Sequence, residues 1–265
     1  MIKPFILTVA LLIFSARADA LEYTDVYYDP AESGWGIFLV QSDTTQFLAF
    51  FVYDTDKKPT WYTAQLAQDV AGSYNGPLYA TTGSYFGMQW NPAQLTVATV
   101  GTVSFVPIDI YSANVTYTIT GVPTVTKTVQ RQTLASYRLA GNYSGSMSGT
   151  VAGCADPADN DDHLRGRFGL NVTQSGDAAS ALTFTFTDTA HAGLVFVVTG
   201  SLTHLGRLYK LTGQFSSTSP QETIPPHPAT IEAYHPTGQG IEGRIMTTLG
   251  DGCRLSIPFS AVLNN

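Results

Sequence analysis

The sequence predicts an all-β protein with two antiparallel β units, of barrel or sandwich architecture, and little or no helix after an N-terminal signal peptide. Apolar and hydroxyl residues alternate strictly at residues 115–120 and 182–187, which is typical of antiparallel strands with one buried face. Turn signals, such as the Gly-Asp-Gly at residues 250–252, recur at short intervals. Charged residues make up only 12% of the chain, about half the usual share.

The N-terminus has the pattern of an export signal. Lys3 is followed by an apolar run over residues 4–14 and by a small-residue cleavage site at residues 18–20. We therefore expect residues 1–20 to be a signal peptide and the protein to be secreted or periplasmic. The rest of the chain has no apolar run of about 18 residues, so we expect no integral membrane segment in the mature chain.

A change in composition divides the mature chain. Trp35, Trp61 and Trp90 lie in its first part, whereas both cysteines and all five histidines follow residue 139. This predicts an aromatic-rich β domain over residues 21–138 and a disulfide-bearing β domain over residues 139–265, with the join near residues 136–140. A single continuous barrel is the alternative, because all-β domains can reach about 200 to 250 residues.

Cys154 and Cys253 are the two cysteines of the chain. In an oxidising compartment, an even number of cysteines favours one disulfide between them. The chain has no C-x-x-C pair that would lower the pKa of a thiol, so we expect the bridge to be structural rather than redox-active.

The most distinctive segment spans residues 28–62. It contains D-P-A-E-S-G-W-G at residues 29–36, then Gln41, F-F-V-Y-D at residues 50–54 and P-T-W-Y at residues 59–62. These motifs resemble a module widespread in secreted bacterial proteins, which is recognised by N-P-x-E-S-G-W-G, W-F-x-Y-D and P-x-W-Y. The resemblance covers about residues 23–135 and implies a secreted bacterial protein of a family without an established activity. Asp29, Phe50 and Lys58 replace the Asn, Trp and Gly that are usual in the module.

Strand alternation makes both faces of this segment apolar. Ile37 and Leu39 share one face, whereas Phe38 and Val40 share the other. Such a sheet is either buried on both sides or binds something on one side. Glu32 stands at the entrance of this apolar strand, where it is either a buried acid with a raised pKa or a cap of backbone amides.

The aromatic motif has two interpretations, core packing and ligand binding. Aromatic residues on strands are most often core. A binding site would use the aromatic faces as a platform for the C–H groups of sugars, with a few polar side chains to orient the ligand. The same residue types suit a protein hot spot. The candidate ligand-binding residues are Glu32, Trp35, Gln41, Tyr53, Asp54, Trp61 and Tyr62.

Signals for catalysis, metals and nucleic acid are weak. The chain lacks G-x-S-x-G, H-E-x-x-H and Walker motifs, and its histidines are scattered singly. The acidic stretch at residues 156–162 lacks the EF-hand spacing and predicts a solvated loop. A pI near 5.0 argues against nucleic acid as a partner. We expect no catalytic residue, no metal site and no cofactor.

These observations favour a secreted, non-catalytic binding protein. Its ligand would be a polysaccharide or another envelope ligand, bound on the aromatic platform. A structural or protein–protein interaction module, such as an inhibitor of a secreted enzyme, is the second interpretation. A hydrolase is the third, and it would need two carboxylates, for instance Glu32 and Asp54, to converge in a cleft.

Overall fold

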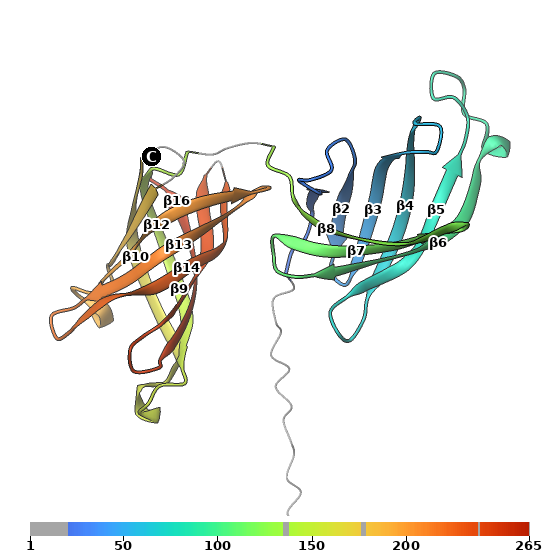
Figure 1. Ribbon diagram of the computed structural model, residues 1–265. Helices are drawn as coiled ribbons and strands as arrows, with labels where there is room; N and C mark the ends of the chain where they lie inside the picture. The colour runs from blue at the N-terminus through green and yellow to red at the C-terminus, as the bar shows by residue number, and fades with distance from the viewer. Residues whose placement is uncertain (1–20, 135–137, 176–178, 238, 265) are drawn as a thin grey trace, which may run out of the picture.

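The computed structural model describes residues 21–134, 138–175, 179–237 and 239–264. These residues form two closed antiparallel barrels, each of eight strands, and the helices among them are short 3₁₀ turns (Figure 1). The all-β prediction with two β units is confirmed, and both units are barrels. The predicted signal peptide, residues 1–20, and part of the predicted join, residues 136 and 137, lie outside the described residues.

The first barrel follows chain order, each strand pairing with the next. It closes where β1 pairs with β8 through two registered residue pairs, Tyr27 with Arg131 and Tyr28 with Gln130. A short turn, η1 (Pro92–Gln94), lies between β5 and β6. The strands are β1 (Asp25–Tyr28), β2 (Gly36–Ser42), β3 (Thr45–Tyr53), β4 (Pro59–Gln68), β5 (Tyr74–Thr82), β6 (Thr96–Pro107), β7 (Ser112–Ile119) and β8 (Val122–Arg131).

The second barrel has the same up-and-down order and closes between β9 and β16. Two more short turns, η2 (Pro157–Asp159) and η3 (Thr189–His191), lie in its loops. The strands are β9 (Gly141–Ala152), β10 (Asp161–Ser175), β11 (Ala179–Phe186), β12 (Val195–Leu205), β13 (Leu208–Thr218), β14 (Thr223–Thr237), β15 (Gly240–Thr248) and β16 (Arg254–Leu263).

Alternation along the strands fills the interior of each barrel. On β2, Ile37 and Leu39 are buried, whereas Phe38 and Val40 lie on the outer surface and are each 54% exposed. A closed barrel covers only the inner face of its wall. The expectation that this sheet is buried on both sides is therefore wrong, and an apolar outer face remains open.

The predicted disulfide between Cys154 and Cys253 is confirmed. Cys154 follows β9 and Cys253 precedes β16, the two strands that close the second barrel. Ala152 and Arg254 are paired residues of β9 and β16, and the disulfide lies just beyond this pair. It therefore extends the contact, or seam, between the two closing strands. The two thiols are 99 residues apart in the sequence, and the bridge ties the first strand of the barrel to its last.

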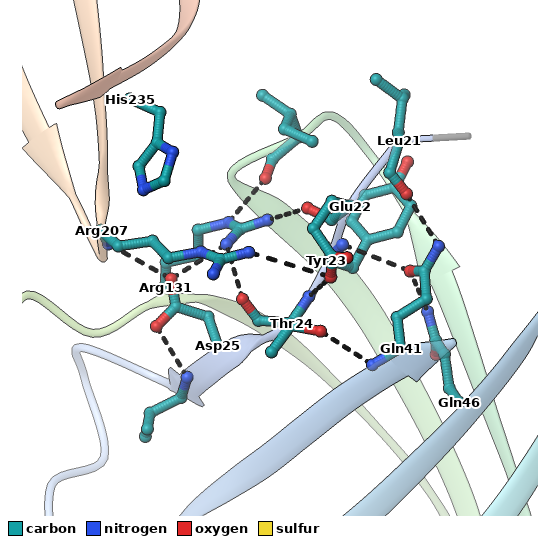
Figure 2. Close-up of polar contacts among 12 residues, drawn as sticks. Leu21, Glu22, Tyr23, Thr24, Asp25, Gln41, Gln46, Arg131, Arg207 and His235 are labelled. Atoms are coloured by element: carbon teal, nitrogen blue, oxygen red, sulfur yellow. Dashed lines mark hydrogen bonds and ion pairs between the residues drawn. The ribbon is translucent and has the colours of Figure 1, made fainter. Parts of the chain in front are cut away.

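Arg131, at the end of β8, is 1% exposed and closes the seam of the first barrel by polar contacts (Figure 2). Its Nη1 lies 2.9 Å from Asp25 Oδ2, in an ion pair that is almost fully buried. Its guanidinium also donates to three backbone carbonyls, those of Glu22 at 2.6 Å, Ile110 at 2.8 Å and Thr24 at 3.2 Å. A buried charge is tolerated only with such complete pairing.

The second barrel contacts the first around this same ion pair. The Arg207 amide, in the β12–β13 turn, donates to Asp25 Oδ2 at 3.2 Å. The Tyr111 hydroxyl donates to the carbonyl of Tyr209 at 3.2 Å, and Lys210 Nζ lies 5.6 Å from the centre of the Tyr111 ring. The turns and termini at this end of the first barrel are therefore the ones that meet the second barrel.

Among the described residues, no helix has the length and apolar character needed to cross a membrane.

Candidate functional site

The β1–β2 turn carries the most distinctive motif of the sequence. Asp29 organises it, because Asp29 Oδ1 accepts a hydrogen bond from the Ala31 amide at 2.9 Å and its carbonyl accepts one from the Glu32 amide at 3.0 Å. Gly34 has a φ of +105°, which L side chains rarely adopt. The motif is thus a tight turn into β2, and it brings Glu32 and Trp35 to the lining of one cavity.

The side chains of Glu32, Trp35 and Lys127 each contact the other two. Lys127 Nζ, on β8, lies 2.5 Å from Glu32 Oε2, and Trp35 Nε1 donates to the same oxygen at 3.1 Å. The ammonium also lies 5.3 Å from the centre of the Trp35 ring, in cation–π geometry. One carboxylate oxygen therefore holds together side chains that come from opposite ends of the first barrel's sequence.

The hydrogen bond from Lys127 lowers the pKa of Glu32 from its ordinary value, and the bond from Trp35 acts in the same direction. Glu32 is solvent-exposed and accepts bonds from side chains rather than from backbone amides. Both expectations for this residue, a buried acid with a raised pKa and a cap of backbone amides, are therefore wrong. Its neighbours keep it ionised.

Asp54 stands at the β3–β4 turn on the same rim. Its Oδ1 accepts hydrogen bonds from the amides of Lys58 at 2.8 Å and Asp56 at 2.9 Å. Lys57, inside this turn, has a φ of +63°. The carboxylate thus accepts hydrogen bonds from amides of the turn that have no partner in the flanking strands.

These turns border a cavity of about 540 Å³ at the mouth of the first barrel. Phe50 and Leu78 are buried at its base, and the Phe50 ring lies 6.1 Å from that of Tyr117. The rim is formed by Glu32, Trp35, Tyr53, Asp54, Thr55 and Lys127. The wall is formed by Phe50, Val52, Tyr62, Leu78, Tyr117, Ile119 and Val122.

The cavity brings together Glu32, Trp35, Tyr53, Asp54 and Tyr62, five of the seven candidate residues. Tyr53 is 60% exposed at the end of β3, whereas Tyr62 is partly buried and packs against the core of the barrel. The platform and core interpretations therefore apply to different rings. Tyr62 belongs partly to the core, and Tyr53 stands at the opening.

Gln41 does not line this cavity. It lies beside Leu21, Tyr23 and Gln46 (Figure 2). Its Oε1 accepts from the Tyr23 amide at 3.2 Å, and its Nε2 donates to the Leu21 carbonyl at 2.9 Å. Gln46 Nε2 approaches the same Oε1 at 3.3 Å. The side chain fastens the segment that precedes β1 to the β2–β3 hairpin.

Trp61 lies on the outer surface of β4, 59% exposed. Its indole Nε1 donates to Thr81 Oγ1 on β5 at 3.2 Å, and it pairs in register with Phe51 of β3. Because neighbouring residues on a strand point to opposite faces, Trp61 and Tyr62 cannot both face the cavity.

Sequence reasoning missed Tyr117, Ile119 and Lys127 as cavity residues. The alternation at residues 115–120 already placed Tyr117 and Ile119 on one face of a strand, but it could not show which other strands they would face. Lys127 is 95 residues from its partner Glu32. Local spacing contains no signal for so distant a pair.

The second barrel has a cavity of about 570 Å³ at the end that carries the disulfide. Phe196 and Phe215 line its base, Asp159 and Glu222 come from the connections between strands, and His227 comes from β14. In the neighbouring acidic loop, Asp156 Oδ1 accepts from the Ala158 amide at 2.9 Å and so caps η2. No group of three or more His, Cys, Asp and Glu side chains within the described part of the chain is arranged to hold a metal ion.

Asp188 and His191 form a carboxylate–imidazole pair in the second barrel, with 2.6 Å between Oδ1 and Nδ1. Asp188 Oδ2 also accepts from the Arg167 amide at 2.9 Å, and this bond is the main reason that the pKa of Asp188 is lowered. The pair caps η3 and ties it to β10. It serves the architecture of that loop.

Comparisons with known proteins found no match for this chain among protein-family models, curated proteins or solved structures.

Proposed function

We propose that this chain is a secreted or periplasmic, non-catalytic binding protein that takes its ligand in the mouth of the first barrel. The proposal also holds that the protein is bacterial and that residues about 23–135 belong to the secreted module that the motifs at residues 29–62 resemble. The single observation that supports it best is the convergence of Glu32, Trp35, Tyr53, Asp54 and Tyr62 on one cavity. Sites for small ligands are typically concave and mainly apolar, with a few placed polar groups.

Three features of the cavity favour binding. Its volume of about 540 Å³ lies within the usual range for small-molecule sites, about 300 to 1,000 Å³. Aromatic faces stand at its rim. The turns that carry Trp35 and Asp54 are held by hydrogen bonds, which reduces the entropy lost when a ligand binds.

The contacts of the two acidic residues favour binding over hydrolysis. A general acid of a glycosidase needs a raised pKa, whereas that of Glu32 is lowered by Lys127. Asp54 Oδ1 is occupied by two backbone amides of its own turn. Both carboxylates therefore support the structure of the rim.

The test is a fluorescence titration with soluble polysaccharides and cell-wall fragments. A Trp35→Phe variant removes the tryptophan at the cavity, and a Trp61→Phe variant is its matched control on the outer surface. A saturable change in emission that survives in Trp61→Phe and is lost in folded Trp35→Phe supports the proposal. A response lost only in Trp61→Phe would move the site to the outer surface.

The outer surface of β2, β3 and β4 supports a second candidate function, binding of a protein partner. It exposes Phe38, Val40, Phe47, Phe51 and Trp61, and the rings of Phe38 and Phe51 lie 5.3 Å apart. Exposed apolar patches of this kind mark interaction sites. Replacing Phe38 and Val40 with Ser would abolish such an interaction and leave ligand binding in the cavity unchanged.

A further inference from the structure

We infer that the ligand of the first-barrel cavity is an amphiphile, with an apolar body inside the barrel and a head group without negative charge at the rim. This inference rests on the proposed function and assigns its chemical class. Three ligand classes are compared: a sugar, a neutral or cationic amphiphile, and an anionic amphiphile. Each needs different side chains at the wall and at the rim. The chemistry of these two zones distinguishes them.

The wall of the cavity favours an apolar body. Phe50 and Leu78 are 5% and 1% exposed, and Val52, Tyr62 and Ile119 pack against the same core. Strands β2 to β7 contain no Asp, Glu, Lys or Arg. A sugar buried against this wall would leave most of its hydroxyl groups without partners, which is unfavourable. An alkyl chain or a fused apolar ring needs no hydrogen-bond partner there and would be removed from water.

The rim disfavours a negatively charged head. Glu32 and Asp54 supply two carboxylates, and Lys127 supplies one ammonium. That ammonium is already engaged by Glu32 and lies over the Trp35 ring. An anionic head would have to compete with Glu32 for Lys127 and would meet both carboxylates, whereas a neutral or cationic head would meet neither penalty. The face of Tyr53, which is 60% exposed, is attractive to cations.

The experiment uses the full mature chain with Trp61→Phe and Trp90→Phe, which leaves Trp35, at the cavity, as the sole tryptophan of the three. Three probes share one decyl chain and differ in the head: decanol, decyltrimethylammonium and decanoate. The two charged probes are used below their critical micelle concentrations and decanol below its solubility limit, and cellohexaose and maltohexaose serve as saccharide probes. We expect saturable changes in Trp35 emission with decanol and decyltrimethylammonium, and binding of decanoate weaker by about tenfold.

The outcomes separate the inference from the proposed function. If decanoate binds as tightly as the other two probes, the assignment of the head group is wrong. If only the saccharides bind, the amphiphile inference fails and the proposed function stands. If no probe or polysaccharide changes the emission of Trp35, both fail.

Two matched variants locate the binding site. Val122 lines the cavity and is 50% exposed, and Val97 is 59% exposed on β6 outside it. Since both side chains are exposed, a lysine at either position should leave the fold intact. Val122→Lys should weaken the binding of decyltrimethylammonium and strengthen the binding of decanoate, each by about tenfold. Val97→Lys should change neither affinity. Equal effects of the two variants would overturn the assignment of the cavity.

Discussion

The two barrels close their walls in different ways, although each has eight antiparallel strands. In the second barrel, β9 and β16 share eight registered pairs, and a disulfide continues the seam. In the first barrel, β1 and β8 share two pairs, and the buried Arg131 bridges the seam through Asp25 and backbone carbonyls. The comparison teaches that a short seam needs a side chain to satisfy the backbone groups that missing strand pairs leave open.

The interiors differ as well. The core of the second barrel contains phenylalanines in edge-to-face contact, Phe168, Phe184, Phe186, Phe196, Phe215 and Phe259. Two of them, Phe196 and Phe215, also line the cavity at the disulfide end. The first barrel gathers Tyr23, Tyr27, Tyr74 and Phe105 towards the end that meets the second barrel. The core rings of the first barrel are thus clustered at that end, and none of these four lines the cavity with the aromatic rim.

Removing the disulfide should give the largest effect and should confine it to the second barrel. We expect Cys154→Ser with Cys253→Ser to lower the free energy of unfolding of that barrel by about 4 to 5 kcal/mol, because the closed loop spans about 100 residues. Urea unfolding followed by tryptophan fluorescence reports on the first barrel, which holds all three tryptophans, and circular dichroism reports on both. An equal shift of both signals would show that the barrels unfold as one unit.

The next effect tests the polar seam of the first barrel. Arg131→Met leaves Asp25 buried without its partner, and we expect a loss of about 3 to 5 kcal/mol. Lys58→Met is the control, because the pair of Lys58 with Asp56 is exposed on both sides and contributes about 0 to 1 kcal/mol. The measurement is urea unfolding followed by fluorescence. A loss as small as that of the control would contradict the role of Arg131.

Overpacking tests the contrast between a fully buried position of the second barrel and a cavity-lining position of the first. Val198, on β12, is fully buried, so Val198→Phe should destabilise the second barrel by about 1 to 3 kcal/mol. Ile119 faces the cavity, and Ile119→Phe should have an effect below about 0.5 kcal/mol because the added ring enters open space. Thermal unfolding of both variants measures the difference. Equal destabilisation would mean that the mouth of the first barrel is packed as tightly as the surroundings of Val198 in the second barrel.

The smallest effect concerns pH. Lys127 lowers the pKa of Glu32 below 4.5, so ionised Glu32 favours the folded rim above the unfolded-state pKa. This contribution is lost as the pH falls through the lower folded-state pKa. In the Trp61→Phe/Trp90→Phe variant, we expect Trp35 emission to titrate with a midpoint below 4.5, and we expect Glu32→Gln to remove that transition. A midpoint above 4.5 would reverse the sign of the coupling.

Some candidate residues that the sequence grouped together are separated in the structure. The barrel separates them by the length of its strands and by the alternation of side chains between its two faces. Strand alternation from Trp35 to Gln41 predicts that these two residues share a face with Ile37 and Leu39, but Trp35 lies just before β2 and Gln41 near its end. Trp35 therefore lines the cavity, whereas Gln41 contacts the segment that precedes β1. Trp61 was grouped with Tyr62 by motif, and the pleat sends them to opposite faces. Because both faces of these strands are apolar, hydrophobicity alone could not show which one is inside.

The sequence by itself determined the all-β class, the division into two units, the cysteine pair and most of the rim residues, because alternation, turn residues and cysteine number are local or compositional signals. Only the tertiary structure decided the barrel closure, the pairing of Lys127 with Glu32 and the burial of Arg131 against Asp25. These contacts join residues about 100 positions apart. Local patterns carry no information about partners so distant, which meet only when the first and last strands of a barrel are brought together.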